Sequence, residues 1–314
     1  MTPALHALPD LPAFDASSLQ GATRLPQYGV IRVVGEDAAS FLHGQLTQDF
    51  ALLGPGQARL AAFCSAKGRM LASFVGFKHG PQEVWLVCPQ DLLAPALKRL
   101  SMFVLRAKAK LSDASAELQV WGLVGDGAGW PVETWGKAAD GDGELVRLMS
   151  AEGRARALWV APAGAPAPAL PVLDAALWSW LEVRSGIAAV TAPIAEAFVP
   201  QMLNYESVDG VNFKKGCYPG QEVVARSQFR GTLKRRAYLA HAPAPVAVGA
   251  EVFAQDDAEQ PVGLVVQAAA APGGGVDALV SLQIAATAGA LQVGAAQGVP
   301  LTLLPLPYAL LEDI

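Results

Sequence analysis

The sequence predicts an α+β fold that is followed by a small C-terminal β-barrel. Over the first third of the chain, strand and helix patterns follow the order β-α-β-β-β-α-β, and a similar but weaker unit comes next. After Arg236, short apolar runs alternate with loops of Ala, Pro and Gly. Runs of strands between helices favour an α+β class over a doubly wound sheet, and evenly spaced short strands are typical of a small barrel.

The first unit begins with a strand at residues 30–34, where β-branched residues alternate. Glu36 and Asp37 then begin a helix whose apolar residues have helical spacing. A hairpin turns at residues 65–68, and a second helix has Asp91 as its expected cap. The remaining expected elements of this unit are strands at 59–64, 70–77, 83–87 and 104–111 and the helix at 91–102.

The rest of the chain continues with the second unit and the barrel. Gly186 closes an expected helix over 174–185. The other expected elements are strands at 118–124, 146–149, 157–160, 238–240, 251–254, 262–266, 279–282 and 301–304 and a helix at 221–229. The expected domains are 22–112, with 200–236 packing back onto it, 113–199, and 237–314.

The composition is that of a globular protein outside the membrane. Hydrophobic residues make up 52% of the chain and charged residues 16%, which excludes a disordered class. No run of 18 apolar residues predicts a membrane span, and residues 1–19 lack the pattern of a secretion signal. Three widely spaced cysteines fit free thiols in a reducing compartment, so we expect a cytoplasmic protein.

Residues 213–236 form a basic segment in an acidic chain. Seven cations and one carboxylate give it a charge of +6, whereas the whole chain carries −5, so the remainder carries −11. This contrast favours binding of an anionic partner over an ordinary solvated face. The cations are Lys214, Lys215, Arg226, Arg230, Lys234, Arg235 and Arg236.

Cys217 lies in this segment, just before a Pro219-Gly220 pair that favours a type II turn. Nearby cations favour a thiolate, so a reactive or cluster-contacting thiol is one interpretation. The other is a small residue in a tight turn, because no histidine lies near in the sequence to act as a base.

Other kinds of site have little support in the sequence. The four histidines are scattered and no zinc-ligand spacing is present, so no metal site is predicted. Neither a P-loop nor a dinucleotide-binding glycine pattern is found. Trp178 and Trp180 lie on the helix that ends at Gly186, where core packing and stacking on a planar ligand are both open.

The motif around Cys217 resembles that of a known family. It is similar to the K-G-C-Y-x-G-Q-E motif of the YgfZ family, whose members are relatives of the glycine-cleavage T-protein. Three further stretches agree, at residues 41–49, 64–70 and 304–308. The motif residues here are Lys214, Lys215, Gly216, Cys217, Tyr218, Gly220, Gln221 and Glu222.

The resemblance implies a three-lobed fold, with two α+β lobes around a central folate site and a C-terminal barrel. The implied folate contacts are Trp178 and Tyr28, the latter in place of a tryptophan. Ser73 stands where a T-protein-like enzyme has its catalytic carboxylate, which speaks against aminomethyl transfer.

The function that the resemblance implies is binding of tetrahydrofolate, or a one-carbon derivative, in support of iron–sulfur enzymes and tRNA thiolation. Cys217 is then the candidate reactive thiol, and Arg226, Arg230, Lys234, Arg235 and Arg236 form a basic surface. The expected partners are iron–sulfur enzymes or cluster-assembly proteins, tRNA-modifying enzymes among them, and no membrane. Two alternatives stay open: a folate-dependent one-carbon transferase, and an accessory module that binds tRNA directly.

Overall fold

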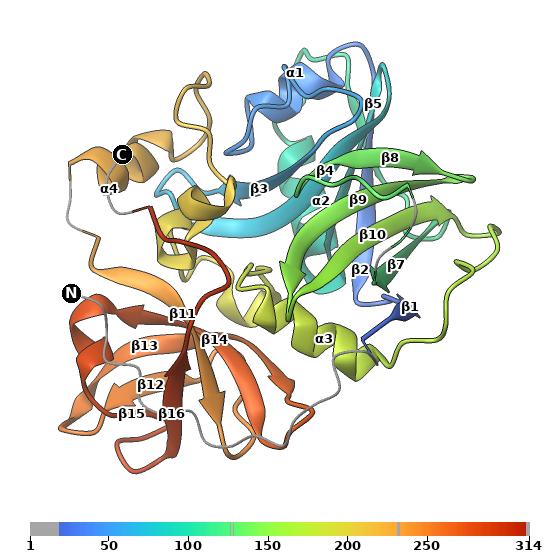
Figure 1. The fold of residues 1–314 in the computed structure, drawn as a ribbon. Helices are drawn as coiled ribbons and strands as arrows, with labels where there is room; N and C mark the ends of the chain where they lie inside the picture. Colours follow the sequence, from blue (N-terminus) through green and yellow to red (C-terminus); the bar gives the residue numbers. More distant parts are fainter. Residues whose placement is uncertain (1–18, 126, 128, 231–232, 312–314) are drawn as a thin grey trace.

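The computed structural model describes residues 19–125, 127, 129–230 and 233–311, and its first sheet holds the first helix–strand unit (Figure 1). The strand order is β3-β4-β5-β2-β6 and every pairing is antiparallel. The elements are β2 (Tyr28–Val34), α1 (Ala38–His43), β3 (Ala58–Cys64), β4 (Met70–Gly80), β5 (Glu83–Pro89), α2 (Gln90–Ser101) and β6 (Lys110–Asp113).

The second sheet has the order β1-β7-β10-β9-β8. Its strands are β1 (Gly21–Arg24), β7 (Leu118–Val124), β8 (Lys137–Asp140), β9 (Gly143–Ala151) and β10 (Arg154–Pro162). The assignment of 22–112 to the first lobe therefore needs a correction at its start. Residues 21–24 pair with β7 in the second sheet, because their backbone extends the ladder along Trp121 to Val124.

The C-terminal part is a closed six-strand barrel, which confirms the predicted fold class. Helix α3 (Ala175–Arg184) lies between the second sheet and the barrel and contacts β13 and β14 (Figure 1). The barrel strands are β11 (Arg235–Ala242), β12 (Glu251–Ala254), β13 (Asp257–Ala270), β14 (Val276–Gln283), β15 (Leu291–Val293) and β16 (Val299–Leu304). The remaining helices of the described residues are η2 (Ala192–Ile194), η3 (Pro200–Leu203), η4 (Tyr205–Val208), α4 (Gln221–Phe229) and η5 (Ile284–Ala288).

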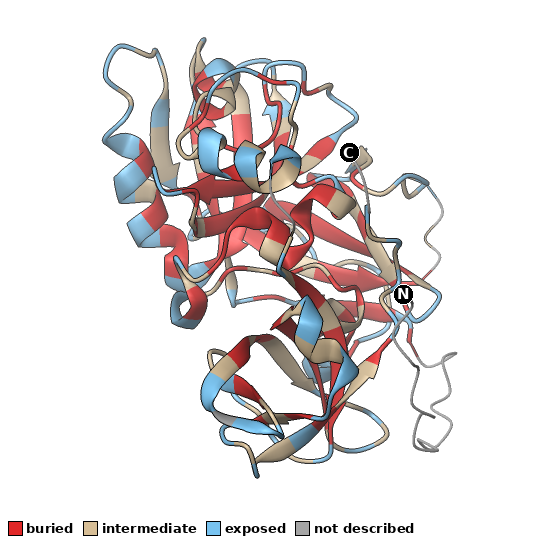
Figure 2. Ribbon diagram, turned by 90° about the vertical axis from the view of Figure 1, so that its left-hand side faces the viewer, coloured by how far each residue is buried: buried red, intermediate tan, exposed pale blue. Residues whose placement is uncertain are grey.

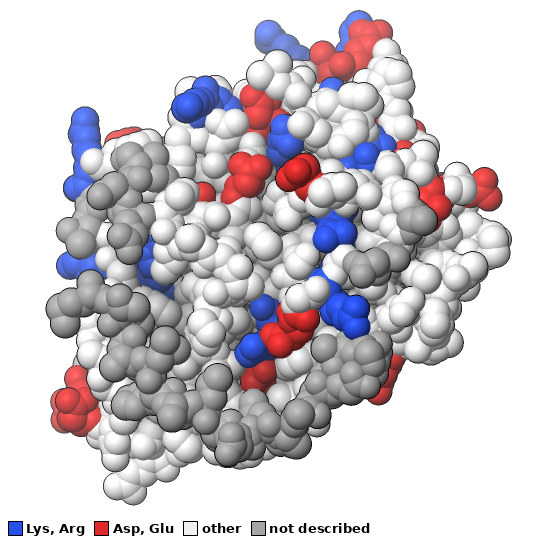
Figure 3. Space-filling view, in the orientation of Figure 1, with Lys and Arg blue, Asp and Glu red and all other residues white. Residues whose placement is uncertain are grey.

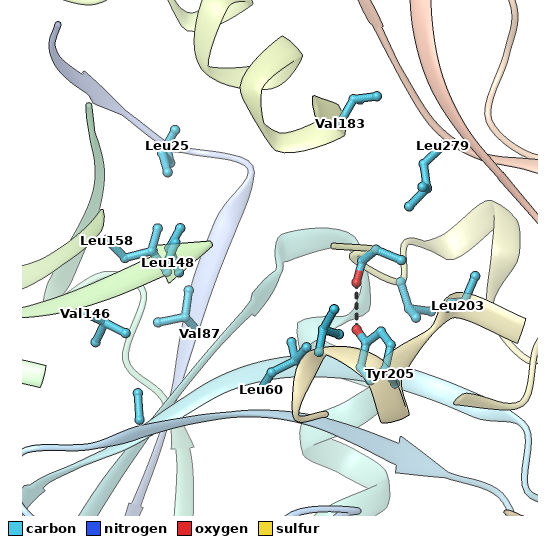
Figure 4. Close-up of a cluster of buried hydrophobic side chains, with 14 of the residues drawn as sticks. Leu25, Leu60, Val87, Val146, Leu148, Leu158, Val183, Leu203, Tyr205 and Leu279 are labelled. Atoms are coloured by element: carbon cyan, nitrogen blue, oxygen red, sulfur yellow. Dashed lines mark hydrogen bonds between the residues drawn. The ribbon is translucent and has the colours of Figure 1, made fainter. Parts of the chain in front are cut away.

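The largest core lies where the two sheets, α3 and the barrel meet (Figure 2). Alternation along β5 explains how one strand serves two cores, because Trp85 and Val87 face this core while Leu86 faces the core under α1 and α2. Figure 4 shows Tyr205 among the aliphatic side chains of the central core, with its hydroxyl donating to the backbone oxygen of Ala188 at 2.6 Å.

Two local predictions were wrong. The expected strand at 104–111 is mostly irregular, because the N–H of Lys108 donates to the Asp37 carboxylate at 2.8 Å, and only β6 pairs with β2. Asp91 does not cap α2, which begins after Pro89. The Asp91 carboxylate instead accepts the N–H of Ala192 at 2.8 Å and so joins α2 to a distant loop.

The helices of the described residues are all too short or too polar to cross a membrane.

Candidate functional site

A buried cavity of about 70 Å³ lies in the central core. It adjoins a wider cleft of about 560 Å³, and the two share Tyr28, Glu182 and Gln267 in their walls. Their position between lobes and their combined size suit a small organic ligand. The cavity is lined mostly by apolar side chains from β3, β4, β5, β9, β10 and the loop after α3, and its polar lining residues include Tyr28, Ser73, Arg156, Glu182, Ser185 and Gln267.

Three of these polar groups interact. The Tyr28 hydroxyl donates to the Glu182 carboxylate at 2.6 Å. Burial raises the pKa of Glu182, although the charge of Arg156 and the Tyr28 hydrogen bond oppose this rise. Burial likewise lowers the pKa of Arg156 and raises that of Tyr28. The cavity thus holds a buried guanidinium and a half-buried carboxylate, and both groups favour a ligand with complementary polar edges.

Trp178 lies behind this polar group and is fully buried. One face of its ring packs so closely on Gly122 that an added Cβ there would lie 2.5 Å from the ring. The guanidinium of Arg156 lies over the ring at 4.5 Å. The indole N–H lies near enough to Glu182 to favour its charged form, yet it makes no hydrogen bond of normal geometry within the described part of the chain. Trp178 therefore packs against Arg156 and lies near Glu182, and both faces of its ring are covered, so neither is open for stacking on a ligand.

Ser73 lines the same cavity, so the residue at the T-protein carboxylate position does face the central site. Its hydroxyl accepts the N–H of Val190 at 2.9 Å and is buried. The carboxylate of the cavity comes instead from Glu182, on α3. Glu182 and Arg156 were not predicted from the sequence, although each is a charged residue inside an apolar strand or helix pattern, which is a detectable signal.

Cys217 lies at the surface and is not among the residues that line the cavity or the cleft. The type II turn after it is confirmed, because Gly220 has φ of 79° and the N–H of Gln221 donates to the backbone oxygen of Tyr218 at 3.2 Å. Only glycine fits at 220, since an added Cβ would lie 2.4 Å from the backbone oxygen of Ser65. The turn is therefore locked against the β3–β4 hairpin.

Lys215 fastens the Cys217 segment to the end of α1. Its ammonium donates to the backbone oxygens of His43 and of Leu46, the latter at 3.0 Å, and lies over the Tyr218 ring at 4.6 Å. Burial lowers the pKa of Lys215 to about 8, although the charges of Asp49 and Cys217 raise it. Lys215 is thus a buried clamp and not part of an exposed basic face.

His43 lies close to the Cys217 segment in the fold, although no histidine lies near Cys217 in the sequence. Its Nδ1 lies 3.0 Å from Oδ1 of Asp49, and the position that a Cβ would take on Gly216 is 3.4 Å from its Nε2. Burial favours the neutral form of Asp49, but hydrogen bonds from the N–H of Leu52 and from His43 outweigh it and lower the pKa. Because 172 residues separate His43 from Lys215, only the tertiary fold brings them together.

Three of the four stretches that carry the family resemblance converge on this surface. Residues 41–49 supply His43, Leu46 and Asp49, and residues 64–70 form the hairpin turn against Gly220. The fourth stretch is elsewhere, where the Tyr308 hydroxyl donates to the backbone oxygen of Gly186 at 2.8 Å.

The predicted basic surface needs one correction. Arg236 is buried, because its guanidinium pairs with Glu206 and donates to the backbone oxygen of Leu311. Arg235 is partly buried and donates to Val262 at 3.1 Å. Figure 3 shows Lys and Arg atoms at the left-hand edge of the molecule, on the side where α4 lies in Figure 1. The exposed members of the segment are Lys214, Arg226, Arg230 and Lys234, and the motif residues Glu222 and Gln221 are exposed and half-buried.

No protein-family model matches the chain. Several proteins named tRNA-modifying protein YgfZ are similar to it. That of Photobacterium profundum is 33% identical over 233 residues, which are 68% of each protein. That of Hamiltonella defensa is 32% identical over 231 residues, again 68% of each, and that of Edwardsiella ictaluri is 30% identical over 311 residues, 91% of this chain and 92% of the relative.

Among solved structures, the glycine cleavage system aminomethyltransferase T from Bartonella henselae superposes with a TM-score of 0.63. The match has 16% sequence identity and covers 93% of this chain and 87% of that protein. The fold is therefore that of the T-proteins, built around a central cavity. Within this fold class, the identities above show that the chain belongs to the YgfZ family, as its motif indicated.

Proposed function

We propose that this protein binds tetrahydrofolate, or a one-carbon derivative of it, in the central cavity and supports the upkeep of iron–sulfur enzymes. The enzymes that thiolate tRNA are among the proposed clients, in keeping with relatives that are named tRNA-modifying proteins. Cys217 is the thiol that acts on a cluster, a partner or a client. The observation that carries the folate part is the partly buried pairing of Tyr28 with Glu182, which line both the cavity and the cleft.

The chemistry of the cavity fits a reduced pterin. The pterin edge presents N–H donors side by side, and the Glu182 carboxylate is an acceptor for such a pair. Arg156 lines the same cavity and suits the neighbouring carbonyl oxygen. The apolar walls suit the ring faces, and the adjoining cleft, which includes Gln27, Gln90 and Thr191, leaves room for the rest of the molecule.

A titration of the purified protein with tetrahydrofolate, followed by tryptophan fluorescence, tests this part. Glu182→Gln should weaken binding about tenfold or more, because a hydrogen bond to a charged group is lost. Glu117→Gln is the matched control, since Glu117 is an exposed carboxylate that pairs with Arg32 at 2.6 Å. No binding by the wild-type chain, or equal affinity of both variants, would refute the folate assignment.

The thiol part is tested in a strain that lacks its own copy of the gene. Cys217→Ala should abolish rescue of iron–sulfur enzyme activity, whereas Cys88→Ala should retain it because Cys88 is buried. Full rescue by Cys217→Ala would remove the role assigned to the thiol.

One-carbon transfer is a second candidate, and one observation favours it: Glu182 provides a carboxylate in the cavity that Ser73 lacks. A bound pterin would take up that carboxylate together with the Tyr28 hydroxyl, however, and would leave it poorly available to an amine. Incubation with tetrahydrofolate and an aminomethyl donor should therefore give no methylene-folate. Product formation that depends on Glu182 would favour the transferase.

Direct binding of tRNA is a third candidate, favoured by the exposed cations Lys214, Arg226, Arg230 and Lys234. Such binding would fall steeply with salt concentration because it releases counterions from the phosphates. A filter-binding titration at two salt concentrations decides the matter, and an absent or salt-insensitive interaction excludes this candidate.

A further inference from the structure

The surroundings of Cys217 contain more chemistry than a thiol in a turn requires. His43, Asp49 and Lys215 all lie beside the segment that carries Cys217, and none of them contributes to the central cavity. Of the three cysteines in the chain, Cys217 is exposed and the other two are buried.

The hydrogen bond to Asp49 selects the tautomer of the neutral His43 ring. Because the Asp49 carboxylate only accepts hydrogen bonds and its pKa is lowered, Nδ1 of His43 carries the proton that the two share at 3.0 Å. Nε2 of the neutral ring is then an acceptor. The N–H of Leu52 holds the same carboxylate oxygen at 2.9 Å, so the acid that orients the ring is itself held in place.

The acceptor nitrogen is directed at the Cys217 segment. Nε2 of His43 lies against Gly216, the residue next to the thiol, and the lack of a side chain at 216 leaves this approach open. Lys215 ties the backbone oxygens of His43 and Leu46 to the same segment, and Cys217 is close enough to act on the charge of Lys215. A nucleophile, a base and an acid that orients the base are the components of an activated thiol site.

We infer that Cys217, His43 and Asp49 form a thiol-exchange site whose substrate is a disulfide. His43 Nε2 takes the proton of the Cys217 thiol, and the resulting thiolate attacks one sulfur of a disulfide R–S–S–R. The S–S bond breaks, a mixed disulfide forms at Cys217, and the leaving thiolate RS⁻ takes the proton from His43. Asp49 is a positioning residue, since it acts through His43.

The two buried cysteines cannot resolve the mixed disulfide at Cys217. Burial raises the pKa of Cys64 to about 12 and that of Cys88 further still, and both side chains are 1% exposed. Neither can attack a mixed disulfide at the surface. A thiol from another molecule must therefore release Cys217, which makes the site one for exchange between molecules.

This inference rests on Cys217 as the reactive thiol of the proposed function, and it does not depend on folate. The test uses the full chain without folate and follows the mixed disulfide with bis(hydroxyethyl) disulfide by mass spectrometry at neutral pH. Wild-type protein should react at Cys217 at least about tenfold faster than His43→Gln, because a positioned base is lost. Cys217→Ala should not react.

Two further variants separate catalysis from structure. His79→Gln is the matched control, since His79 also has its Nδ1 3.0 Å from a carboxylate, Glu144, but has no cysteine beside it, and it should react like wild type. For His43→Ala, imidazole in the buffer should restore much of the rate, and for Asp49→Asn the same addition should raise it. Equal rates for wild type and His43→Gln, or no effect of imidazole on His43→Ala, would overturn the inference. Folate titration of the same samples reports on the other part of the proposed function independently.

Discussion

Two carboxylates, one in the central cavity and one beside Cys217, are shifted in opposite directions. Glu182 has a raised pKa because burial outweighs the help of Arg156 and Tyr28. Asp49 has a lowered pKa because hydrogen bonds from Leu52 and His43 outweigh burial. The Asp49 carboxylate accepts hydrogen bonds from a backbone N–H and from His43, whereas the Glu182 carboxylate accepts one from Tyr28.

The opposite pKa shifts of Glu182 and Asp49 indicate that the two regions suit different chemical roles. The cavity holds polar groups that have lost water and still lack full partners, which favours recognition of a ligand. The Cys217 region holds a negative charge on Asp49 that orients His43 against the segment carrying the exposed thiol, which favours proton transfer. The predictions below test this contrast.

The largest effect is expected from Glu182→Ala. It should lower the free energy of unfolding by about 3 kcal/mol or more, because the charge of Arg156 stays buried without its opposite. Urea unfolding at neutral pH measures this loss. Glu117→Ala removes an exposed carboxylate and should cost less than about 1 kcal/mol. Equal losses for the two variants would show that the cavity is not electrostatically distinct.

Because the pKa of Lys215 is lowered in the folded protein, the free energy of unfolding should depend on pH. Between pH of about 8 and 10.5 the unfolded chain keeps the Lys215 proton and the folded chain loses it. Stability therefore rises with pH in this window, by at most about 1.4 kcal/mol per pH unit and less where water screens the ammonium.

Lys215→Met lacks this titration, so the difference between wild type and variant should shift in favour of wild type as the pH rises across the same window. Urea titrations over that range measure it. A constant difference would mean that Lys215 is hydrated in the folded state.

Asp49→Asn should lower the free energy of unfolding by about 1–2 kcal/mol at neutral pH, since charge-assisted hydrogen bonds become neutral ones. The folded pKa of Asp49 lies below the ordinary 3.8, so its stabilisation is present above that value and is lost as the pH falls through the folded pKa. Unfolding curves at neutral pH and in acid below the ordinary pKa test this. A deficit that stays the same under both conditions would contradict the lowered pKa of Asp49.

The smallest effect belongs to the exposed cations. Arg230→Gln should change the free energy of unfolding by less than about 0.5 kcal/mol. Arg236→Gln, in the same segment, should cost about 3 kcal/mol because it leaves the Glu206 charge buried. Thermal unfolding of both variants compares the two positions, and similar losses would show that the segment is one surface after all.

Several elements were predictable from local pattern alone. The hairpin between β3 and β4 and the end of α3 before Gly186 follow from turn residues and periodicity that neighbours in the sequence provide. The strands β1, β8 and β15 were missed, and each has only three or four residues in which to show a pattern, although β12 of the same length was predicted. The strand at 104–111 failed because its backbone bonds to Asp37, far away in the chain.

In the candidate site, too, some features depend on neighbouring residues of the sequence and others on residues that are distant in the chain. The motif around Cys217 and the charge of its segment are properties of consecutive residues, so they are sufficient to indicate the family and the fold class. The role of each residue could not be deduced in this way, because it depends on neighbours that are distant in the chain. Lys215 and Arg236 look like surface cations in the sequence and are buried in the fold.

The sequence by itself determined the α+β class, the barrel and the thiol in its turn, because periodicity and turn chemistry act over a few residues. Only the tertiary structure decided that His43 and Asp49 lie beside the segment that carries Cys217, and that Arg156, Glu182 and Tyr28 share one cavity. Tyr28 and Glu182 are 154 residues apart, and the pKa shift of each depends on burial and charges that exist only once distant segments have packed.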